Sequence, residues 1–291
     1  DPLAFCREKA VNKYIKYNFS FCICNTFCCA KIYGFLRSKI PTIWWIHENI
    51  SPQEAALFER DLRKAKNIFV PSELTLSYIS PYNDRCRILP YPVKDKVKNF
   101  NPERQKKFPV EISVYGSLYP RKGQDIFLRA IKALPRSVRQ KGIFKLVGGK
   151  TLPEYYNKEL LPLSKQISEV SYVDTIKKSE VYHASMDTVS VLCCPSREDP
   201  CPLVVIDALM HGCPVILSDH VGQKDIIENG QNGYVFSTEE ELTAILMEIL
   251  NNPEKLVQMS VAARNTFLEH FDYQACANKL KDIREKLCKK S

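Results

Sequence analysis

Short apolar runs alternate with amphipathic stretches along most of this chain, a pattern typical of strands and helices that follow one another. Strands are expected at 19–24, 42–46, 67–70, 87–89, 111–115, 144–147, 170–173, 189–193 and 215–217. Helices are expected at 27–37, 52–64, 74–79, 124–134, 152–166 and 178–185. Such an alternation predicts parallel sheets whose strands are joined by right-handed helical crossovers.

A polar segment punctuated by proline, at 91–109, interrupts the alternation. A helical tail at 239–289 follows the last strand, with breaks at Asn252 and Pro253 and again around Phe271. We therefore expect a first domain at 1–93, a linker at 94–109, a second domain at 110–270 and a final helix at 271–291 that crosses back to the first domain.

The 291 residues are 45% apolar and 26% charged, which is ordinary for a globular protein, and no apolar run approaches the ~20 residues of a membrane span. The net charge of +9 is concentrated, because residues 1–107 carry 19 Lys and Arg against 10 Asp and Glu. This excess fits either a solvated basic face or attraction to an anionic membrane or a phosphate-bearing acceptor. No nucleic-acid-binding motif accompanies it, so nucleic acid is not an expected partner.

The chain contains twelve cysteines, yet their spacing fits neither a disulfide framework nor a zinc site. Cys22, Cys24, Cys28 and Cys29 have no CxxC spacing and no nearby histidine, so we expect no metal there. Abundant cysteine without a pairing pattern indicates a reducing cytoplasm, with a peripheral position at the inner membrane face as a further expectation.

The segment 195–214, PSREDPCPLVVIDALMHGCP, combines a strand end, an acidic loop and a helix start. The prolines suit the first turn of a helix over 203–211, and Gly212 suits its end. Free backbone N–H groups at Leu203 and Val204 and the helix dipole favour a phosphate. Together with the carboxylates of Asp199 and Asp207, they suggest a ligand with phosphates and hydroxyls, such as a nucleotide sugar.

This segment resembles the donor-site motif of retaining glycosyltransferases of the GT-B fold, in particular family 4. The segments 114–134 and 221–236 resemble, in the right order, the family's glycine-loop-Lys-Gly segment and a turn after the following strand. The resemblance covers about 180 residues. It implies an α/β fold of two Rossmann-like parallel-sheet domains facing a cleft, and sugar transfer to a glycan or lipid-linked acceptor in cell-surface polysaccharide assembly.

The resemblance also implies roles for particular residues near the phosphates. Lys122, in the loop that runs from Gly116 to a helix, would place an ammonium on the leaving diphosphate. The family usually has an arginine after the first glycine, where this chain has Ser117, and Arg121 is not assumed to replace it.

Further roles concern the sugar and the base. Asp199 would lie near the hydroxyls of the donor sugar, with Glu198 as a substitute, and Asp207 would hold the ribose. Both matched carboxylates are one methylene shorter than the family's usual glutamates. Gly149 and Val173 occupy positions where the family's base pocket forms.

His47 follows a predicted strand and resembles the family's histidine near the transferred sugar. A histidine at such a place is also commonly structural. The family needs no metal, so we expect neither a metal nor another cofactor.

One feature departs from the family pattern, because the first domain is about half as long as the second. We expect either a truncated first domain or, preferably, the C-terminal portion of a longer protein. Two other interpretations therefore stay open: a non-catalytic donor-binding or scaffold module, and a GT-B nucleotide-sugar epimerase.

Overall fold

The computed structural model describes residue 12, residue 17 and residues 19–288. The chain divides into two compact units: Val93–Asp272 forms one, and Asp1–Pro92 with Tyr273–Ser291 forms the other. The last helix, α14 (Tyr273–Cys288), therefore belongs to the first unit. Residues 94–109, predicted as a linker, belong to the second unit, where Arg264 Nη1 donates to Asp95 Oδ1 at 3.0 Å.

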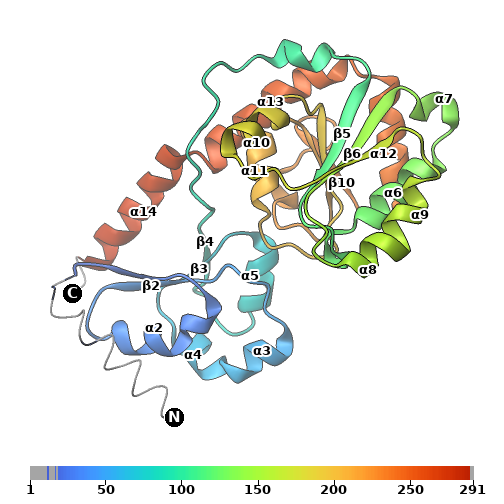
Figure 1. Cartoon of the computed structure of the whole chain (residues 1–291). Coiled ribbons are helices and arrows are strands. Elements are labelled where there is room, and N and C mark those ends of the chain that lie inside the picture. Colours follow the sequence, from blue (N-terminus) through green and yellow to red (C-terminus); the bar gives the residue numbers. More distant parts are fainter. Residues whose placement is uncertain (1–11, 13–16, 18, 289–291) are drawn as a thin grey trace. The chain divides into compact units, whose positions relative to one another are not determined.

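The first unit is built on a four-stranded parallel sheet in the order β1-β2-β3-β4 (Figure 1). Its strands are β1 (Cys22–Cys24), β2 (Thr42–Trp45), β3 (Ile68–Val70) and β4 (Arg87–Ile88). Its helices, besides α14, are the 3-10 turn η1 (Phe27–Cys29), α2 (Ala30–Leu36), α3 (Pro52–Leu57), α4 (Glu59–Lys64) and α5 (Glu73–Ile79).

Both faces of this sheet are buried. Successive side chains of a strand point to opposite faces, and Trp44 accordingly joins a core with Tyr33 and Leu62. Ile43 and Trp45 face the other way, and the apolar side of α14 packs on that face. Burial on both sides explains why three of the four residues of β2, Ile43, Trp44 and Trp45, are large and apolar.

The second unit contains a six-stranded parallel sheet in the order β10-β9-β8-β5-β6-β7. Its strands are β5 (Val110–Tyr115), β6 (Gly142–Val147), β7 (Val170–Val173), β8 (Val191–Cys194), β9 (Val215–Ser218) and β10 (Gly233–Phe236). This is the doubly wound Rossmann order, in which the direction of strand addition reverses between the parallel neighbours β5 and β8. Ligands of such sheets bind at that switch point, outside the carboxyl ends of the strands.

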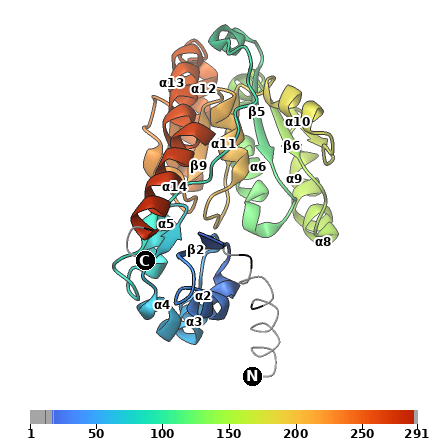
Figure 2. The ribbon, with the colours of Figure 1, turned by 90° about the vertical axis from the view of Figure 1, so that its left-hand side faces the viewer.

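Helices cover this sheet (Figure 2). α6 contacts α9 and α12, and α11 contacts α13. The helices are η2 (Pro102–Lys106), η3 (Pro120–Lys122), α6 (Gln124–Ala133), α7 (Arg136–Arg139), α8 (Pro153–Tyr155), η4 (Tyr156–Leu160), α9 (Leu161–Ser164), α10 (Ser179–Met186), α11 (Leu203–Met210), η5 (Lys224–Ile226), α12 (Glu239–Asn251) and α13 (Lys255–His270).

Several predicted elements differ from those observed. The strand β10 lies in the segment 221–236, where the family resemblance predicts a turn. Gly233 pairs with Val215 of β9, and a Cβ at Gly233 would lie 2.3 Å from Val215 O. The helix predicted at 152–166 is interrupted by the π-helical η4. The helix predicted at 52–64 divides at Phe58, where φ is −118°. The strand predicted at 19–24 is limited to β1.

Candidate functional site

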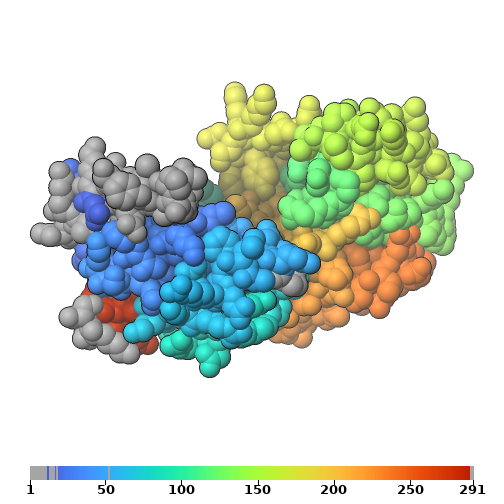
Figure 3. Space-filling view, turned by 90° about the horizontal axis from the view of Figure 1, so that it is seen from below, coloured from blue at the N-terminus to red at the C-terminus, as the bar shows by residue number. Residues whose placement is uncertain are grey.

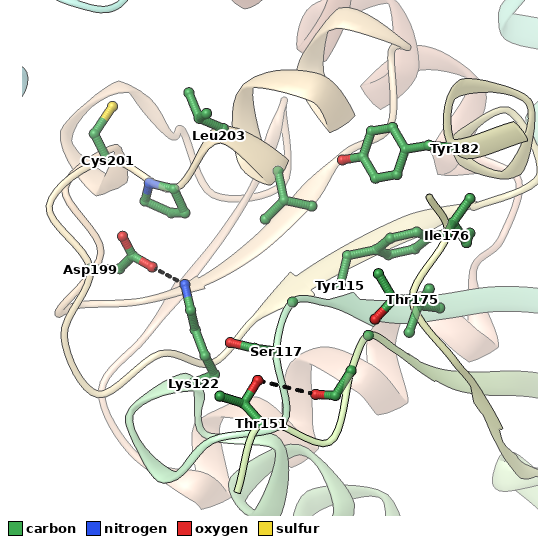
Figure 4. Close-up of a pocket in the computed structure, with 16 residues that line it drawn as sticks. Tyr115, Ser117, Lys122, Thr151, Thr175, Ile176, Tyr182, Asp199, Cys201 and Leu203 are labelled. Carbon is green, nitrogen blue, oxygen red and sulfur yellow. Dashed lines mark hydrogen bonds and ion pairs between the residues drawn. The ribbon is translucent and has the colours of Figure 1, made fainter. Parts of the chain in front are cut away.

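A cavity of about 580 Å³ lies at the carboxyl edge of the second unit's sheet (Figure 4). Loops that follow β5, β6, β7 and β8, together with the starts of α10 and α11, supply its walls. The lining residues are Tyr115, Gly116, Ser117, Lys122, Val147, Gly148, Gly149, Thr151, Thr175, Ile176, Tyr182, Asp199, Cys201, Pro202, Leu203 and Val204. The cavity thus lies at the switch point that the strand order defines.

Lys122 and Asp199 meet on one side of this cavity, although 77 residues separate them in sequence. Lys122 Nζ lies 2.5 Å from Asp199 Oδ2, and Arg121 Nη1 lies 3.8 Å from the same oxygen. The Asp199 side chain is only 9% exposed, so water has little access to this carboxylate. Its shortest ion pair is the one with Lys122, which is charge-assisted and therefore strong. The result is a fixed ammonium inside a concave site.

The loop that carries Lys122 depends on Gly123. This glycine has φ of +68°, and a Cβ there would lie 1.9 Å from Pro195 O. Because a side chain fits neither this conformation nor this space, glycine is required for η3 to approach the end of β8.

An ionic network around the buried Asp125 joins the same two loops. Arg197 donates to both oxygens of Asp125, at 2.9 and 2.6 Å, and its own N–H donates to Arg121 O at 2.8 Å. Burial alone would raise the pKa of Asp125, but Arg197, Tyr155 and Arg129 outweigh it and lower the pKa to about 2. Asp125 is therefore a charged anchor that positions the loop of Lys122.

The start of α11 offers backbone donors to the cavity. Pro202 is the N-cap residue and no side chain caps the helix, while Leu203 and Val204 both line the cavity. The first N–H groups of a helix have no intrahelical acceptor, so they suit an anion. The predicted phosphate-binding helix start thus shares a cavity with Lys122.

Gly116 and Gly148 allow the loops after β5 and β6 to approach each other in another part of the cavity wall. A Cβ at Gly148, whose φ is +151°, would lie 2.0 Å from Gly116 O. Of the residues expected to bind the donor, Gly116, Ser117 and Gly149 line the cavity, whereas Val173 does not. Thr175 and Ile176 line it instead, because the chain enters the cavity just after β7 ends.

Asp207 does not line the cavity. Its Oδ2 accepts a hydrogen bond from Tyr182 Oη at 2.8 Å, and Tyr182 is the cavity residue. Burial raises the pKa of Asp207, although Tyr182, His183 and His211 act against this shift. Tyr182 and Tyr115 line the cavity as well, although no motif in the sequence points to them. Their rings pack edge to face at 5.9 Å between centroids.

Glu198 and Arg121 lie at the cavity's margin. Glu198 is exposed and does not line the cavity, and its backbone carbonyl accepts from Arg121 Nη1 at 2.6 Å. Arg121 does not line the cavity either.

His47 belongs to the first unit, just after β2. Its Nε2 lies 2.6 Å from Asn25 Oδ1, and its buried Nδ1 has no hydrogen-bond partner within the described part of the chain. Burial lowers the pKa of His47, against a smaller opposite effect of Glu48. The ring is therefore neutral at pH 7 and leaves Nδ1 as an acceptor.

No cluster of three or more metal-binding side chains occurs in residues 12, 17 and 19–288. The eleven cysteines in these ranges form no disulfide. None of the helices described is both long and apolar enough to cross a bilayer.

The family model described as glycosyl transferases group 1 matches residues 95–266, which include the whole cavity. The chain belongs to this family. Among related sequences, an uncharacterized glycosyltransferase from Haemophilus influenzae is 29% identical over 152 residues, which is 51% of this chain and 42% of the relative. The chain spans less than half the length of the curated relatives that it matches.

Solved structures support the fold of this group 1 family member. Sucrose-phosphate synthase from Thermosynechococcus elongatus has a TM-score of 0.81 at 19% identity, covering 98% of this chain and 77% of that protein. Anabaena HepE in complex with UDP has a TM-score of 0.78 at 17% identity, covering 95% and 82%. The fold is that of GT-B glycosyltransferases, with two Rossmann-like parallel-sheet units, as predicted.

Proposed function

We propose that the chain transfers a sugar from a nucleotide-diphosphate sugar to a glycan or lipid-linked acceptor, with retention of configuration. One observation carries this proposal: Lys122, Asp199 and the first amides of α11 line a single cavity at the sheet's switch point. Membership of the glycosyl transferases group 1 family supports the reaction class. The HepE complex makes UDP the first nucleotide to test.

In this proposal the second unit binds the donor. The α11 amides and Lys122 hold the diphosphate, whose negative charge grows as the bond from the anomeric carbon to the phosphate oxygen breaks. The acceptor oxygen forms the new bond to that carbon, and its proton passes to the departing phosphate. Because an ammonium and helix amides already face this charge, we propose that transfer needs no metal.

Asp199 would have two tasks. Its Oδ2 holds Lys122, which keeps the ammonium directed into the cavity. Its other oxygen can accept a hydrogen bond from a hydroxyl group of the donor sugar, as the family motif leads us to expect. The setting that we propose is the cytoplasmic side of cell-surface polysaccharide assembly.

A transfer assay tests the proposal. The chain is incubated with UDP- and GDP-sugars and with glycan or lipid-linked acceptors, and released nucleoside diphosphate is measured while proton NMR determines the anomeric configuration of the product. We expect acceptor-dependent release, a retained configuration and no effect of EDTA. Lys122→Ala should abolish release, whereas Lys132→Ala, which replaces an exposed lysine of α6, should not.

Other outcomes would contradict the proposal. Binding of a nucleotide without transfer to any acceptor would indicate a non-catalytic donor-binding module. Release without an acceptor, accompanied by an altered sugar, would indicate an epimerase.

A further inference from the structure

A second and larger cavity, of about 980 Å³, lies in the first unit. It is formed where β2, β3 and β4 begin and by the last turns of α14, which Figure 3 shows in red against the blue and cyan surface. This is the amino edge of the sheet, opposite to the carboxyl edge at which such folds bind their substrates. This cavity therefore lies at the opposite edge of the sheet from His47, which directly follows the carboxyl end of β2.

The walls of this cavity are strongly basic. Six cationic residues line it and no acidic residue does; they are Arg37, Lys39, Lys66, Arg85, Arg87 and Lys286. The ion pairs among the described residues of the first unit join Lys31 to Asp61 and Arg63 to Glu59. None of them involves a cation of the cavity, so no carboxylate in the described part of this unit forms an ion pair with its cations.

Helix ends explain only part of this charge. Helices α2, α4 and α5 end near this edge, and basic residues stabilise the carboxyl ends of helices. Arg37 Nη1 donates to Lys64 O at 2.9 Å, and Arg85 Nη2 donates to Arg63 O at 3.5 Å. The other four cations of the cavity make no such bond to the carboxyl end of a helix in the described structure; they are Lys39, Lys66, Arg87 and Lys286.

The remaining cations contact neutral groups or solvent. Lys39 Nζ lies 3.8 Å from the centroid of the Phe35 ring, and the guanidinium of Arg87 lies 4.8 Å from that of Phe69. Lys66 and Lys286 are exposed. Four uncompensated cations around one concavity repel one another, and a multivalent anion would relieve that repulsion.

We propose that this cavity binds a phosphate-bearing anion, independently of the donor cavity of the second unit. Lysine and arginine together suit phosphate oxygens, the first as a point charge and the second as a planar fork. The volume exceeds what one inorganic phosphate fills, so the ligand has further groups besides a phosphate. Ile283 and Leu287 form an apolar side of the cavity, which suits a lipid that bears the phosphate in its headgroup; a soluble polyphosphate shares the same chemistry.

Two probes distinguish these sources. The first is co-sedimentation with vesicles of phosphatidylcholine containing phosphatidylglycerol, and the second is calorimetry with tripolyphosphate in the presence of saturating UDP. The test variant combines Lys66→Glu with Lys286→Glu. The control combines Arg60→Glu with Lys281→Glu, which makes the same change of charge at exposed sites of the first unit outside the cavity.

We expect the test variant to lose affinity for at least one probe by about tenfold or more, since two cations of the cavity become anions that repel the phosphate. The control should lose much less, and UDP binding and thermal unfolding should be unchanged in both variants. Loss with vesicles identifies a lipid headgroup, and loss with tripolyphosphate alone identifies a soluble anion. Equal losses in both variants, or no binding of either probe by the parent chain, would overturn the proposal.

Discussion

At the scale of single residues, Tyr182 changes the interpretation of the carboxylate at Asp207. The family motif implies that Asp207 holds the ribose, yet its Oδ2 is bound to Tyr182 and only the tyrosine lines the cavity. Burial raises the pKa of Asp207 and also that of Tyr182. The phenol therefore stays neutral, and the carboxyl group of Asp207 ionises less readily than in water. Tyr182 therefore stabilises the charged form of Asp207.

Tyr182→Phe should lower the free energy of unfolding by about 1–3 kcal/mol at pH 7, because it leaves the partly buried carboxylate of Asp207 without its donor. An acid whose pKa is raised by folding destabilises the native state as the pH rises through that pKa, so the defect should shrink at lower pH. Denaturant unfolding at several pH values measures this. The matched control is Tyr115→Phe, which removes a 3.1 Å bond to the neutral Ser185 Oγ and should cost about 0.5–1.5 kcal/mol. Equal, pH-independent losses would contradict the account.

At the scale of elements, the loop after β5 and the loop after β8 are held together by Asp125 and Arg197. Folding lowers the pKa of Asp125 from 3.8 to about 2, so its stabilising contribution is complete above pH 3.8 and is lost as the pH falls through about 2. Asp125→Asn should therefore lower the free energy of unfolding by about 1–3 kcal/mol at pH 7. The difference from the parent chain, measured by denaturant unfolding, should narrow below pH 3.8. A difference that stays constant with pH would refute the role of the charge.

The glycine of the same loop gives an independent test. Gly123→Ala should destabilise the chain and weaken nucleotide binding, because its Cβ would lie 1.9 Å from Pro195 O and force Lys122 to move. Gly34→Ala is the control, since nothing lies within 4 Å of its Cβ and alanine favours the helix α2 by up to about 1 kcal/mol. Thermal unfolding and calorimetry should separate the two. If Gly123→Ala bound nucleotide as tightly as the parent, the loop would not position Lys122.

The sequence predicted these elements well where a local signal decides them. Pro202 and Gly212 mark both ends of α11, and the apolar runs of β5 and β8 locate the switch point. The sequence did not predict features that depend on contacts between residues distant in the chain. The strand pairing of Gly233, the position of Val173 outside the cavity and the bond from Tyr182 to Asp207 all depend on neighbours far away in the sequence.

At the scale of the whole molecule, the two units have separate cores, and α14 completes the first. Leu280, Ile283 and Leu287 pack on Ile43, Trp45, Phe69 and Leu89. Removal of residues 273–291 should therefore expose this face and destabilise the first unit, while the second keeps its cavity. We expect faster hydrogen exchange in β2 and β3 and unchanged UDP affinity. Unaltered exchange in these strands would show that α14 is not needed for that core.

The central claim is that Lys122 and the start of α11 together bind a diphosphate. Calorimetric titration of UDP into the parent chain, Lys122→Ala and Lys132→Ala tests it most directly. We predict that Lys122→Ala weakens UDP binding by about tenfold or more, since a hydrogen bond to a charged group contributes about 1.5–3 kcal/mol, and that Lys132→Ala binds like the parent. Equal affinities of the three proteins for UDP would contradict the account.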